Sequence, residues 1–210
     1  GVVSSVAPTL LPGTIALFKR TTPLASISIS EGHFVSLYPE LESGALDVLI
    51  ARIWQPRELP GIEQMSLYSE PLNIVVGRDH PLAAKKSLEW SDVATQPWIL
   101  PKADSVARLA VDALFAEHGL TPPTNTIASL SLSLNVEILK VMPALALMPQ
   151  SQAQNLATRG EIVSLPLDTQ GFLSEARCFW RSDQVASNST LSLFLKCLRQ
   201  ATDGVNTIPF

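Results

Sequence analysis

The chain has 210 residues, of which 46% are hydrophobic and 16% are charged. This balance is that of a folded protein and excludes a disordered chain, which carries too few apolar residues to form a core. The formal net charge is -4, whereas a protein that binds nucleic acid by neutralising phosphates needs a basic surface. We therefore expect no DNA binding by this chain alone. The length allows one large core or two small ones.

The chain carries no membrane or disulfide signal. Cys178 and Cys197 fall in a predicted strand and a predicted helix, where an unpaired cysteine packs as a small hydrophobe. No run approaches the roughly 20 apolar residues that span a bilayer, and the first residues lack the pattern of a signal peptide. Because Gly1 falls inside a predicted strand, we expect the chain to be part of a longer protein. We expect that protein to be cytoplasmic.

Strands and helices alternate in the first part of the chain. Ser4-Ser5 precedes apolar residues at helical spacing, and Thr21-Thr22-Pro23 ends that helix. The predicted strands are 1–3, 25–30 and 46–51, and the predicted helices are 6–18 and 34–41. This order predicts a doubly wound sheet with right-handed crossovers. Ligands of such sheets bind at the carboxyl ends of the strands.

The same alternation returns later in the chain. Residues 54–61 are a predicted loop, and residues 62–76 are predicted to be extended with a break at Glu70-Pro71, where a second lobe begins. The further predicted strands are 98–100, 125–128, 145–148, 162–164 and 172–180, and the predicted helices are 105–118, one ending near 140, and 188–199. The alternating serines and leucines of residues 129–134 fit a strand, but we favour a helix start because two serines precede an apolar run.

Sequence motifs for catalysis are missing. The three histidines show no HxxH or HExxH spacing, and neither cysteine has a basic neighbour that would favour a thiolate. The chain has no GxSxG, GxGxxG or P-loop pattern. We therefore expect no catalytic residue, no metal site, no cofactor and no enzyme activity.

A set of segments stands in an order that resembles the effector-binding domain of LysR-type transcriptional regulators. They are Leu10-Leu11-Pro12, Glu31-Gly32, residues 41–50, His80-Pro81-Leu82-Ala83, residues 97–101, residues 115–122, residues 144–149 and residues 160–167. The resemblance covers about residues 1 to 200 and implies an α/β fold with two Rossmann-like lobes and a ligand cleft between them, the type 2 periplasmic-binding-protein fold. The expected lobes are 1–70 with 168–202, and 71–167, followed by a tail at 203–210.

The resemblance also implies a function. We expect a domain that binds a small organic anion between its lobes. Residues 129–133 and 147–151 are similar to the subgroup of the family that responds to aromatic acids and sugars, so we expect an aromatic acid or a sugar acid. The implied partners are further copies of the chain, as a homodimer or homotetramer, and DNA through an N-terminal domain outside this chain. The alternative is a periplasmic solute-binding protein of a transporter, which shares the fold but is exported.

Candidate ligand-binding residues in the first lobe follow the predicted strand ends. Ser5, with Ser4, lies where the family places a ligand-contacting hydroxyl at a helix N-terminus, although helix capping would also explain a serine there. Arg52 ends the third strand and can bind a carboxylate, or can instead pair with Glu31 or Asp47. The turn after the second strand supplies the remaining candidates, Glu31, Gly32, His33 and Phe34.

Candidates in the second lobe follow the same logic. Pro101, Lys102 and Ser105 precede one predicted helix, and Ser129 opens another. Lysine at such a place is more often a solvated surface charge. The family usually has glycines where this chain has Met142-Pro143-Ala144, and Met142 either lines an apolar pocket or packs in the core.

Overall fold

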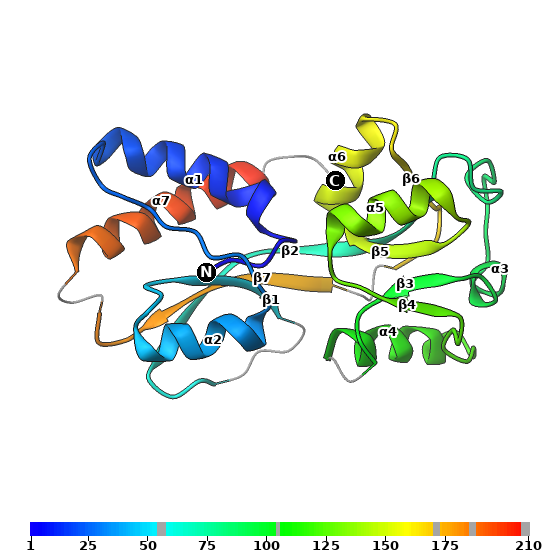
Figure 1. The fold of residues 1–210 in the computed structure, drawn as a ribbon, viewed down its shortest axis with the longest axis horizontal. Coiled ribbons are helices and arrows are strands. Elements are labelled where there is room, and N and C mark those ends of the chain that lie inside the picture. The colour runs from blue at the N-terminus through cyan, green and yellow to red at the C-terminus, as the bar shows by residue number, and fades with distance from the viewer. Residues whose placement is uncertain (54–57, 104–105, 170–172, 185–187, 207–210) are drawn as a thin grey trace. The chain divides into compact units, whose positions relative to one another are not determined.

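The computed structural model describes residues 1–53, 58–103, 106–169, 173–184 and 188–206 (Figure 1). The helices are α1 (Ala7–Thr21), α2 (Phe34–Ser43), α3 (Trp90–Ala94), α4 (Val106–Glu117), α5 (Leu132–Val141), α6 (Gln150–Thr158) and α7 (Ser189–Asn206). The strands are β1 (Leu49–Ile53), β2 (Ile62–Gly77), β3 (Trp98–Leu100), β4 (Thr126–Ala128), β5 (Leu145–Pro149), β6 (Ile162–Ser164) and β7 (Leu173–Arg181).

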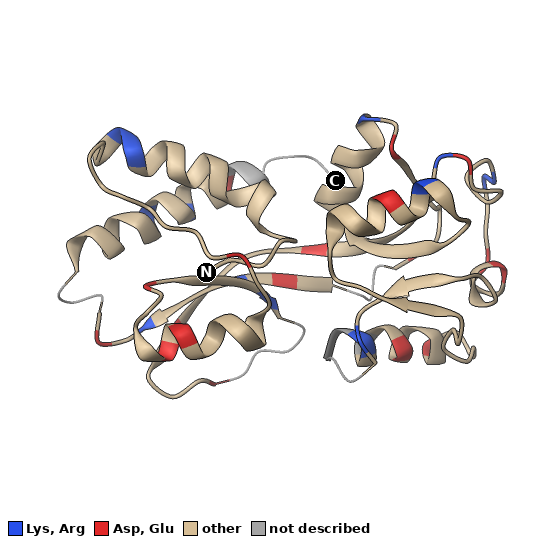
Figure 2. Cartoon of the chain, viewed as in Figure 1, with Lys and Arg blue, Asp and Glu red and all other residues tan. Residues whose placement is uncertain are grey.

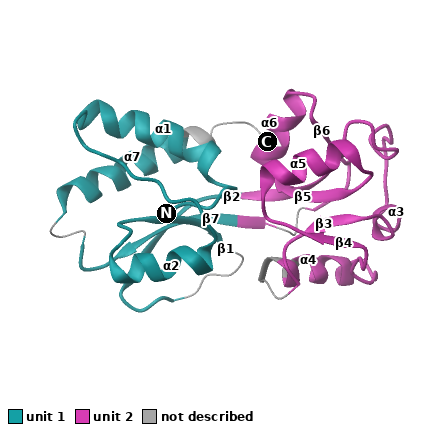
Figure 3. Ribbon diagram, in the orientation of Figure 1, with its two compact units in different colours: residues 1–69, 175–210 teal, residues 70–174 magenta. Residues whose placement is uncertain are grey.

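The chain forms two compact units (Figure 3). Unit 1 comprises residues 1–69 and 175–210, and unit 2 comprises residues 70–174. The chain therefore passes from unit 1 into unit 2 within β2 and returns within β7. Each unit has its own core, as expected when an α/β sheet is covered by helices on both faces.

Unit 1 is built on strand β1, which pairs antiparallel with β7, and β7 in turn neighbours β2. Helices α1 and α7 pack together on one face of this sheet, with the Phe18 and Phe194 rings edge to face at 5.5 Å between centroids, and α2 covers the other face (Figure 1). The core on the α1 and α7 side includes Val2, Leu10, Leu11, Ile50, Ala176, Cys178 and Leu198. The core on the α2 side includes Leu37, Leu41, Leu46, Leu49, Ala51 and Phe179.

Two predicted strands of unit 1 are not strands in the structure. Val2 makes only isolated parallel bridges, to Glu31 and to Ile50, and residues 25–30 carry no strand assignment. The prediction of a strand at residues 25–30 is therefore wrong. A strand requires a ladder of backbone hydrogen bonds to a neighbouring strand. Among the described residues, the segment 25–30 makes one such hydrogen bond, from Val2 N–H to Ser30 O at 2.9 Å.

Unit 2 contains the sheet order β2-β5-β3-β4, with β6 also paired to β2. Strands β3, β4 and β5 run parallel, and the second half of β2 runs antiparallel to β5 and β6. One core, with α5, includes Val75, Ile99, Val136, Leu139, Ala146 and Met148. Trp90, Trp98 and Phe115 form an aromatic cluster that joins α3 and α4 to β3.

Most elements of the second half are confirmed, including the helix start in the serine-leucine segment, where the Ser131 hydroxyl accepts from Leu134 N–H at 3.4 Å. The predicted break at Glu70-Pro71 is wrong, because β2 continues through both residues. Helices α3 and α6 were not predicted. The predicted tail is partly wrong as well, since α7 extends to Asn206, and residues 207–210 lie outside the described residues.

The side chain of His80 gives unit 2 a predictable dependence on pH. His80 is buried, and its Nδ1 accepts a hydrogen bond from Leu82 N–H at 3.1 Å, which requires the neutral ring. Burial lowers the pKa of His80, a shift that the carbonyl of Pro143 opposes. The unfolded chain therefore takes up a proton near the ordinary pKa of 6.5 while the folded chain does not, so stability is present above that value and is lost as pH falls below it.

We expect the melting temperature to fall between pH 7 and pH 5.5, with a loss of at most about 1.4 kcal/mol per pH unit from this histidine. Thermal melting by circular dichroism across that range measures it. In His80→Gln, which cannot titrate, the same range should give a smaller slope. An equal slope in both proteins would assign the effect to other groups.

Candidate functional site

The carboxyl ends of the first three chain segments meet at one edge of unit 1. Val2 bridges Glu31 on one side and Ile50 on the other, both in parallel. Gly32 N–H donates to Val2 O at 3.1 Å, and Val3 N–H donates to Ile50 O at 3.0 Å. The residues that follow these bridges, which include Ser4, Ser5, Gly32 and Arg52, are therefore brought to the same edge, as the sequence predicted.

Arg52 lies directly beside the Ser5 backbone. Its Nη2 donates to Ser5 O at 3.4 Å and to the hydroxyl of Tyr68 at 3.3 Å. The guanidinium carbon also lies 5.4 Å from the centre of the Tyr68 ring, a cation–π distance. Within the described residues, no ion pair joins Arg52 to Glu31 or Asp47. The alternative in which either carboxylate binds Arg52 is therefore wrong.

Ser5 does not cap the first helix. The N-cap residue of α1 is Val6, and no side-chain hydrogen bond caps this end. The first turn of α1 carries no acidic residue. The N–H groups of Val6 and Ala7 donate to Val3 O, that of Thr9 donates to Val6 O, and Pro8 has none, so this end offers a ligand the partial positive charge of the helix. The half-buried Ser5 and the half-buried Arg52 therefore lie together at an end of α1 that favours an anion.

Residues 31–34, the other candidates of unit 1, differ in exposure and in contacts. Glu31 and His33 are exposed, and His33 N–H donates to the Ser36 hydroxyl at 3.2 Å at the start of α2. Gly32 is tightly enclosed, because a Cβ there would lie 3.2 Å from Leu37 Cγ. Phe34 stacks on Tyr38 at 5.3 Å and meets Phe179 edge to face at 5.5 Å. Packing in the α2 core therefore accounts for Phe34.

The second set of candidates lies at the carboxyl edge of unit 2. Strands β3 and β4 are parallel, and Ser129 N–H donates to Leu100 O at 3.0 Å. Ser129 therefore follows β4 next to the place where Pro101 and the exposed Lys102 follow β3. The Ser129 hydroxyl accepts from Ser131 N–H at 3.2 Å, so it helps to shape the start of α5. Ser105 lies outside the described residues.

Other kinds of site find no support in the described part of the chain. No group of three or more His, Cys, Asp or Glu residues is placed to hold a metal ion. Both cysteines are buried and unbridged, as predicted, and burial raises the pKa of the Cys178 thiol. None of the described helices is both long enough and apolar enough to cross a bilayer. Basic residues of the described segments are scattered over both units rather than gathered on one helix (Figure 2).

Comparison with known proteins identifies the family. The family described as the LysR substrate binding domain matches residues 1–203. The chain belongs to this family. It is the effector-binding domain of a LysR-type transcriptional regulator, and the members of this family are regulators rather than enzymes.

Individual relatives agree with the family assignment. The HTH-type transcriptional regulator GalR of Pseudomonas putida is 28% identical over 191 residues, which cover 91% of this chain and 48% of that protein. GbpR of Azospirillum brasilense is 24% identical over 204 residues, which cover 97% of this chain and 59% of that protein. The chain spans about half the length of the curated relatives that it matches. These relatives are transcriptional regulators, which favours the regulator over the transporter protein.

Solved structures of LysR-type domains share the fold. The effector-binding domain of BenM with its effector benzoate superposes with a TM-score of 0.77 and 21% identity, over 100% of this chain and 93% of that one. The reduced OxyR regulatory domain of Pseudomonas aeruginosa gives a TM-score of 0.74 and 21% identity, over 95% of each chain. The LysR-type domain thus has the predicted fold, which resembles type 2 periplasmic-binding proteins.

Met142 lies away from the other candidates of this LysR-type domain. It is the C-cap of α5, whereas Ser129 precedes the N-terminus of that helix. Met142 also comes just before β5, and Leu145 N–H donates to Pro97 O at 2.8 Å, at the amino ends of β5 and β3. The side chain packs against the core of unit 2. The structure therefore does not bring Met142 to the carboxyl edge, and core packing accounts for it.

Two features of the LysR-type domain escaped sequence reasoning. Tyr68, which holds Arg52, lies in β2 and shows no signal beyond its place in an extended segment. Glu70 is buried, and its carboxylate accepts from Ser151 N–H at 2.6 Å and from the Ser151 hydroxyl at 3.1 Å. The N-terminus of α6 is thus occupied by a carboxylate of the chain itself, which removes this helix end as a candidate for an anion.

Proposed function

We propose that this LysR-type domain senses a small organic anion, which binds to Ser5 and Arg52 at the carboxyl edge of unit 1. The observation that carries the proposal is the contact between the Arg52 guanidinium and the Ser5 backbone at the uncapped start of α1. Arginine presents a planar fork of donors that matches a carboxylate. The helix terminus adds a favourable dipole.

The surroundings of Arg52 suit this role. Tyr68 is 5% exposed and offers both its hydroxyl and its ring to the guanidinium. A side chain held in this way loses less conformational entropy when a ligand binds, so more of the interaction energy contributes to affinity. The carboxyl edge of unit 2 carries further polar groups, Lys102 and Ser129. That the ligand lies between the two lobes stays a prediction.

The proposed class of ligand is an aromatic acid or a sugar acid. Benzoate is the effector of BenM, whose effector-binding domain shares this fold, and it serves here as a probe. In the full regulator, the ligand would shift the balance between two arrangements of the protein by binding one of them more tightly. We propose that these domains form a homodimer or homotetramer, that DNA is bound by a separate N-terminal domain, and that the regulator acts in the cytoplasm.

A melting screen with aromatic carboxylates, sulfonates, aliphatic carboxylates and sugar acids tests the proposal, because a ligand that binds only the folded state raises the melting temperature. For an acid that does so, Arg52→Ala is expected to weaken binding by about 10- to 100-fold, the loss of one or two charge-assisted hydrogen bonds. Ser5→Ala should weaken it less. Isothermal titration calorimetry measures both.

Arg78→Ala is the matched control, since Arg78 is in unit 2 and its side chain is 71% exposed. It should bind the acid like the unmodified chain, and the melting temperature of unliganded Arg52→Ala should stay within a few degrees. Unchanged affinity in Arg52→Ala would contradict the proposed site. A large loss of unliganded stability would show that Arg52 serves the fold.

A further inference from the structure

Unit 1 contains a cavity of about 530 Å³ that the proposed anion site does not use. Residues 64–66 of β2 form one wall, and the others are formed by Trp180 of β7 and by Leu195, Lys196 and Arg199 of α7. The volume is within the range of about 300–1,000 Å³ that is usual for binding pockets.

The cavity lies away from the proposed anion site. On β7, Ala176 pairs with Arg52, whereas Phe179, the residue before Trp180, pairs with Leu49 at the start of β1. Trp180 is therefore about four residues along the strand from the partner of Arg52, or about 13 Å at roughly 3.3 Å per residue. Trp180 thus lies near the amino end of β1, whereas Arg52 is near its carboxyl end.

The β2 wall is the outer edge of the sheet of unit 1. In the order β1-β7-β2, residues 62–69 have β7 on one side, and β5 and β6 pair with β2 only from Leu72 onward. Within the described residues, no strand pairs with the other side of residues 62–69. Every second residue of an edge strand presents its N–H and C=O outward, so this wall can accept an additional strand.

The cavity combines an apolar floor with two cations. Trp180 is buried, and its Nε1 donates to Glu63 Oε2 at 3.1 Å, so the indole is held in place. Lys196 and Arg199 are exposed and lie three residues apart in α7, a spacing that puts them on one face of the helix. Within the described residues, neither makes an ion pair. The walls therefore suit a ligand that carries an apolar side chain and carboxylates.

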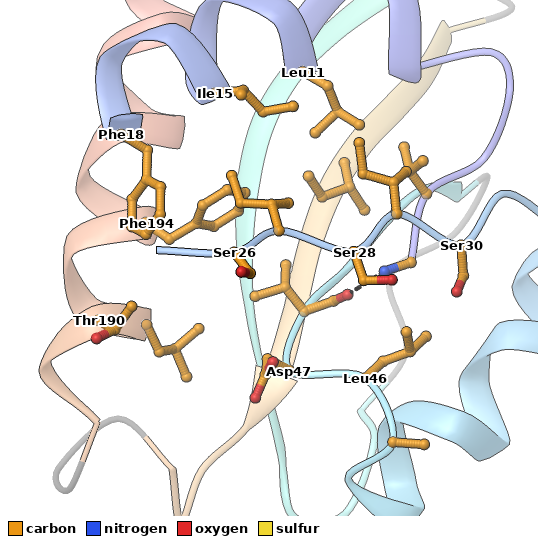
Figure 4. Close-up of a pocket in the computed structure, with 18 of the residues that line it drawn as sticks. Leu11, Ile15, Phe18, Ser26, Ser28, Ser30, Leu46, Asp47, Thr190 and Phe194 are labelled. Carbon is orange, nitrogen blue, oxygen red and sulfur yellow. Dashed lines mark hydrogen bonds between the residues drawn. The ribbon is translucent and has the colours of Figure 1, made fainter. Parts of the chain in front are cut away.

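Charge distinguishes this cavity from another one in unit 1. The other cavity has a volume of about 420 Å³ and is lined by residues of α1 and α7 and by residues 26–30 (Figure 4). Its charged side chains are Glu40 and Asp47, and no described lysine or arginine lines it. The charged side chains of the 530 Å³ cavity are both basic. An acidic ligand is therefore attracted to the cavity beside β2.

We propose that the cavity between β2 and α7 is a docking site for an acidic, extended segment of a partner protein, which adds a strand to the outer edge of β2 at residues 62–66. Backbone hydrogen bonds to the edge supply the affinity, and side chains at alternate positions supply the specificity. An apolar side chain of this segment enters the cavity over Trp180. Carboxylates two residues before and after it lie on the same face of the added strand and reach Lys196 and Arg199.

A five-residue peptide tests the inference. Acetylated and amidated Asp-Thr-Leu-Thr-Asp carries this pattern in either strand direction, and Lys-Thr-Leu-Thr-Lys is its charge-reversed control. NMR titration should show that the acidic peptide binds about tenfold or more tightly than the basic one, since two exposed charge contacts change sign. With the acidic peptide at about ten times its Kd, hydrogen exchange of alternate amides of residues 62–66 should slow by about tenfold, because outward N–H groups gain partners.

Reversal of the two cations provides a second test. Lys196→Glu with Arg199→Glu should weaken binding of the acidic peptide by about tenfold or more, because attraction becomes repulsion. Arg78→Glu with Lys86→Glu is the matched control, since it makes the same change in net charge on exposed residues of unit 2. It should leave the affinity within about twofold, because distant charges are screened by salt. Arg52→Ala should also bind the peptide like the unmodified chain, which separates this site from the anion site.

Four results overturn the inference. They are a Kd of the acidic peptide weaker than about 1 mM, equal binding of the two peptides, unchanged affinity in Lys196→Glu with Arg199→Glu, and exchange that does not slow at alternate amides of residues 62–66. Two further results overturn it by assigning another occupant. Slowing of the same amides by benzoate would indicate a small-molecule pocket, and slowing that rises with protein concentration in the absence of peptide would indicate a second copy of the chain.

Discussion

Gly77→Ala is expected to destabilise unit 2 by about 3 kcal/mol, near the upper end of what overpacking costs. Gly77 is the last residue of β2 and pairs with Ile162 of β6. A Cβ at this position would lie 2.0 Å from Leu139 O and 2.9 Å from the Leu139 carbonyl carbon. These are backbone atoms of α5, so no side-chain rotation relieves the clash. The helix has to move away from the sheet.

This movement would also disturb the core, because Leu139 packs with Val75 and Val136 on the same face. Thermal melting should show a decrease of about 6–12 °C for a loss of this size. The requirement for glycine is steric here, since Gly77 is not among the glycines with a positive φ.

Gly13→Ala is the matched control. Gly13 lies within α1, and a Cβ there would meet only the Ala201 Cβ, at 3.8 Å. Alanine in a helix interior should stabilise the domain by about 0.5–1 kcal/mol. If Gly77→Ala melted like the unmodified chain, the close approach of α5 to β2 would be wrong.

Phe115→Ala is expected to cost about 3–5 kcal/mol, the usual range for removing a large buried aromatic side chain. Phe115 is fully buried in α4. Its ring meets Trp90 at 5.5 Å and Trp98 at 5.4 Å, both edge to face at 80°. Such aromatic pairs contribute about 0.5–1.5 kcal/mol beyond the area that they bury. The substitution removes both contacts and leaves a cavity between α3, α4 and β3.

Chemical denaturation and near-ultraviolet circular dichroism measure this loss, because the two tryptophans lose their fixed environment. Leu109→Ala in the same helix is the control, since Leu109 is 61% exposed, and it should change stability by less than about 0.5 kcal/mol. Equal effects of the two substitutions would contradict the placement of α4.

The sequence predicted the candidate site where local pattern and strand order suffice. Ser5 and Arg52 follow two segments that end at one edge, and the structure brings them into contact. The roles of other candidates depend on packing, which sequence spacing does not contain. Phe34 was a candidate for ligand stacking, but Tyr38 and Phe179 take up its ring. Met142 was placed by comparison with family glycines, but the length of α5 separates it from Ser129.

The amino-acid sequence by itself determined the α/β class, the two-lobe alternation and most helices and strands, because apolar periodicity and turn residues act over a few positions. Tertiary structure decided what depends on partners far apart in the chain. Residues 25–30 alternate as a strand should, yet they lack a ladder beside Ser28. Glu70 is buried and accepts two hydrogen bonds from Ser151, 81 residues later. Such pairings are set by the whole fold, since each buried polar group needs a specific partner.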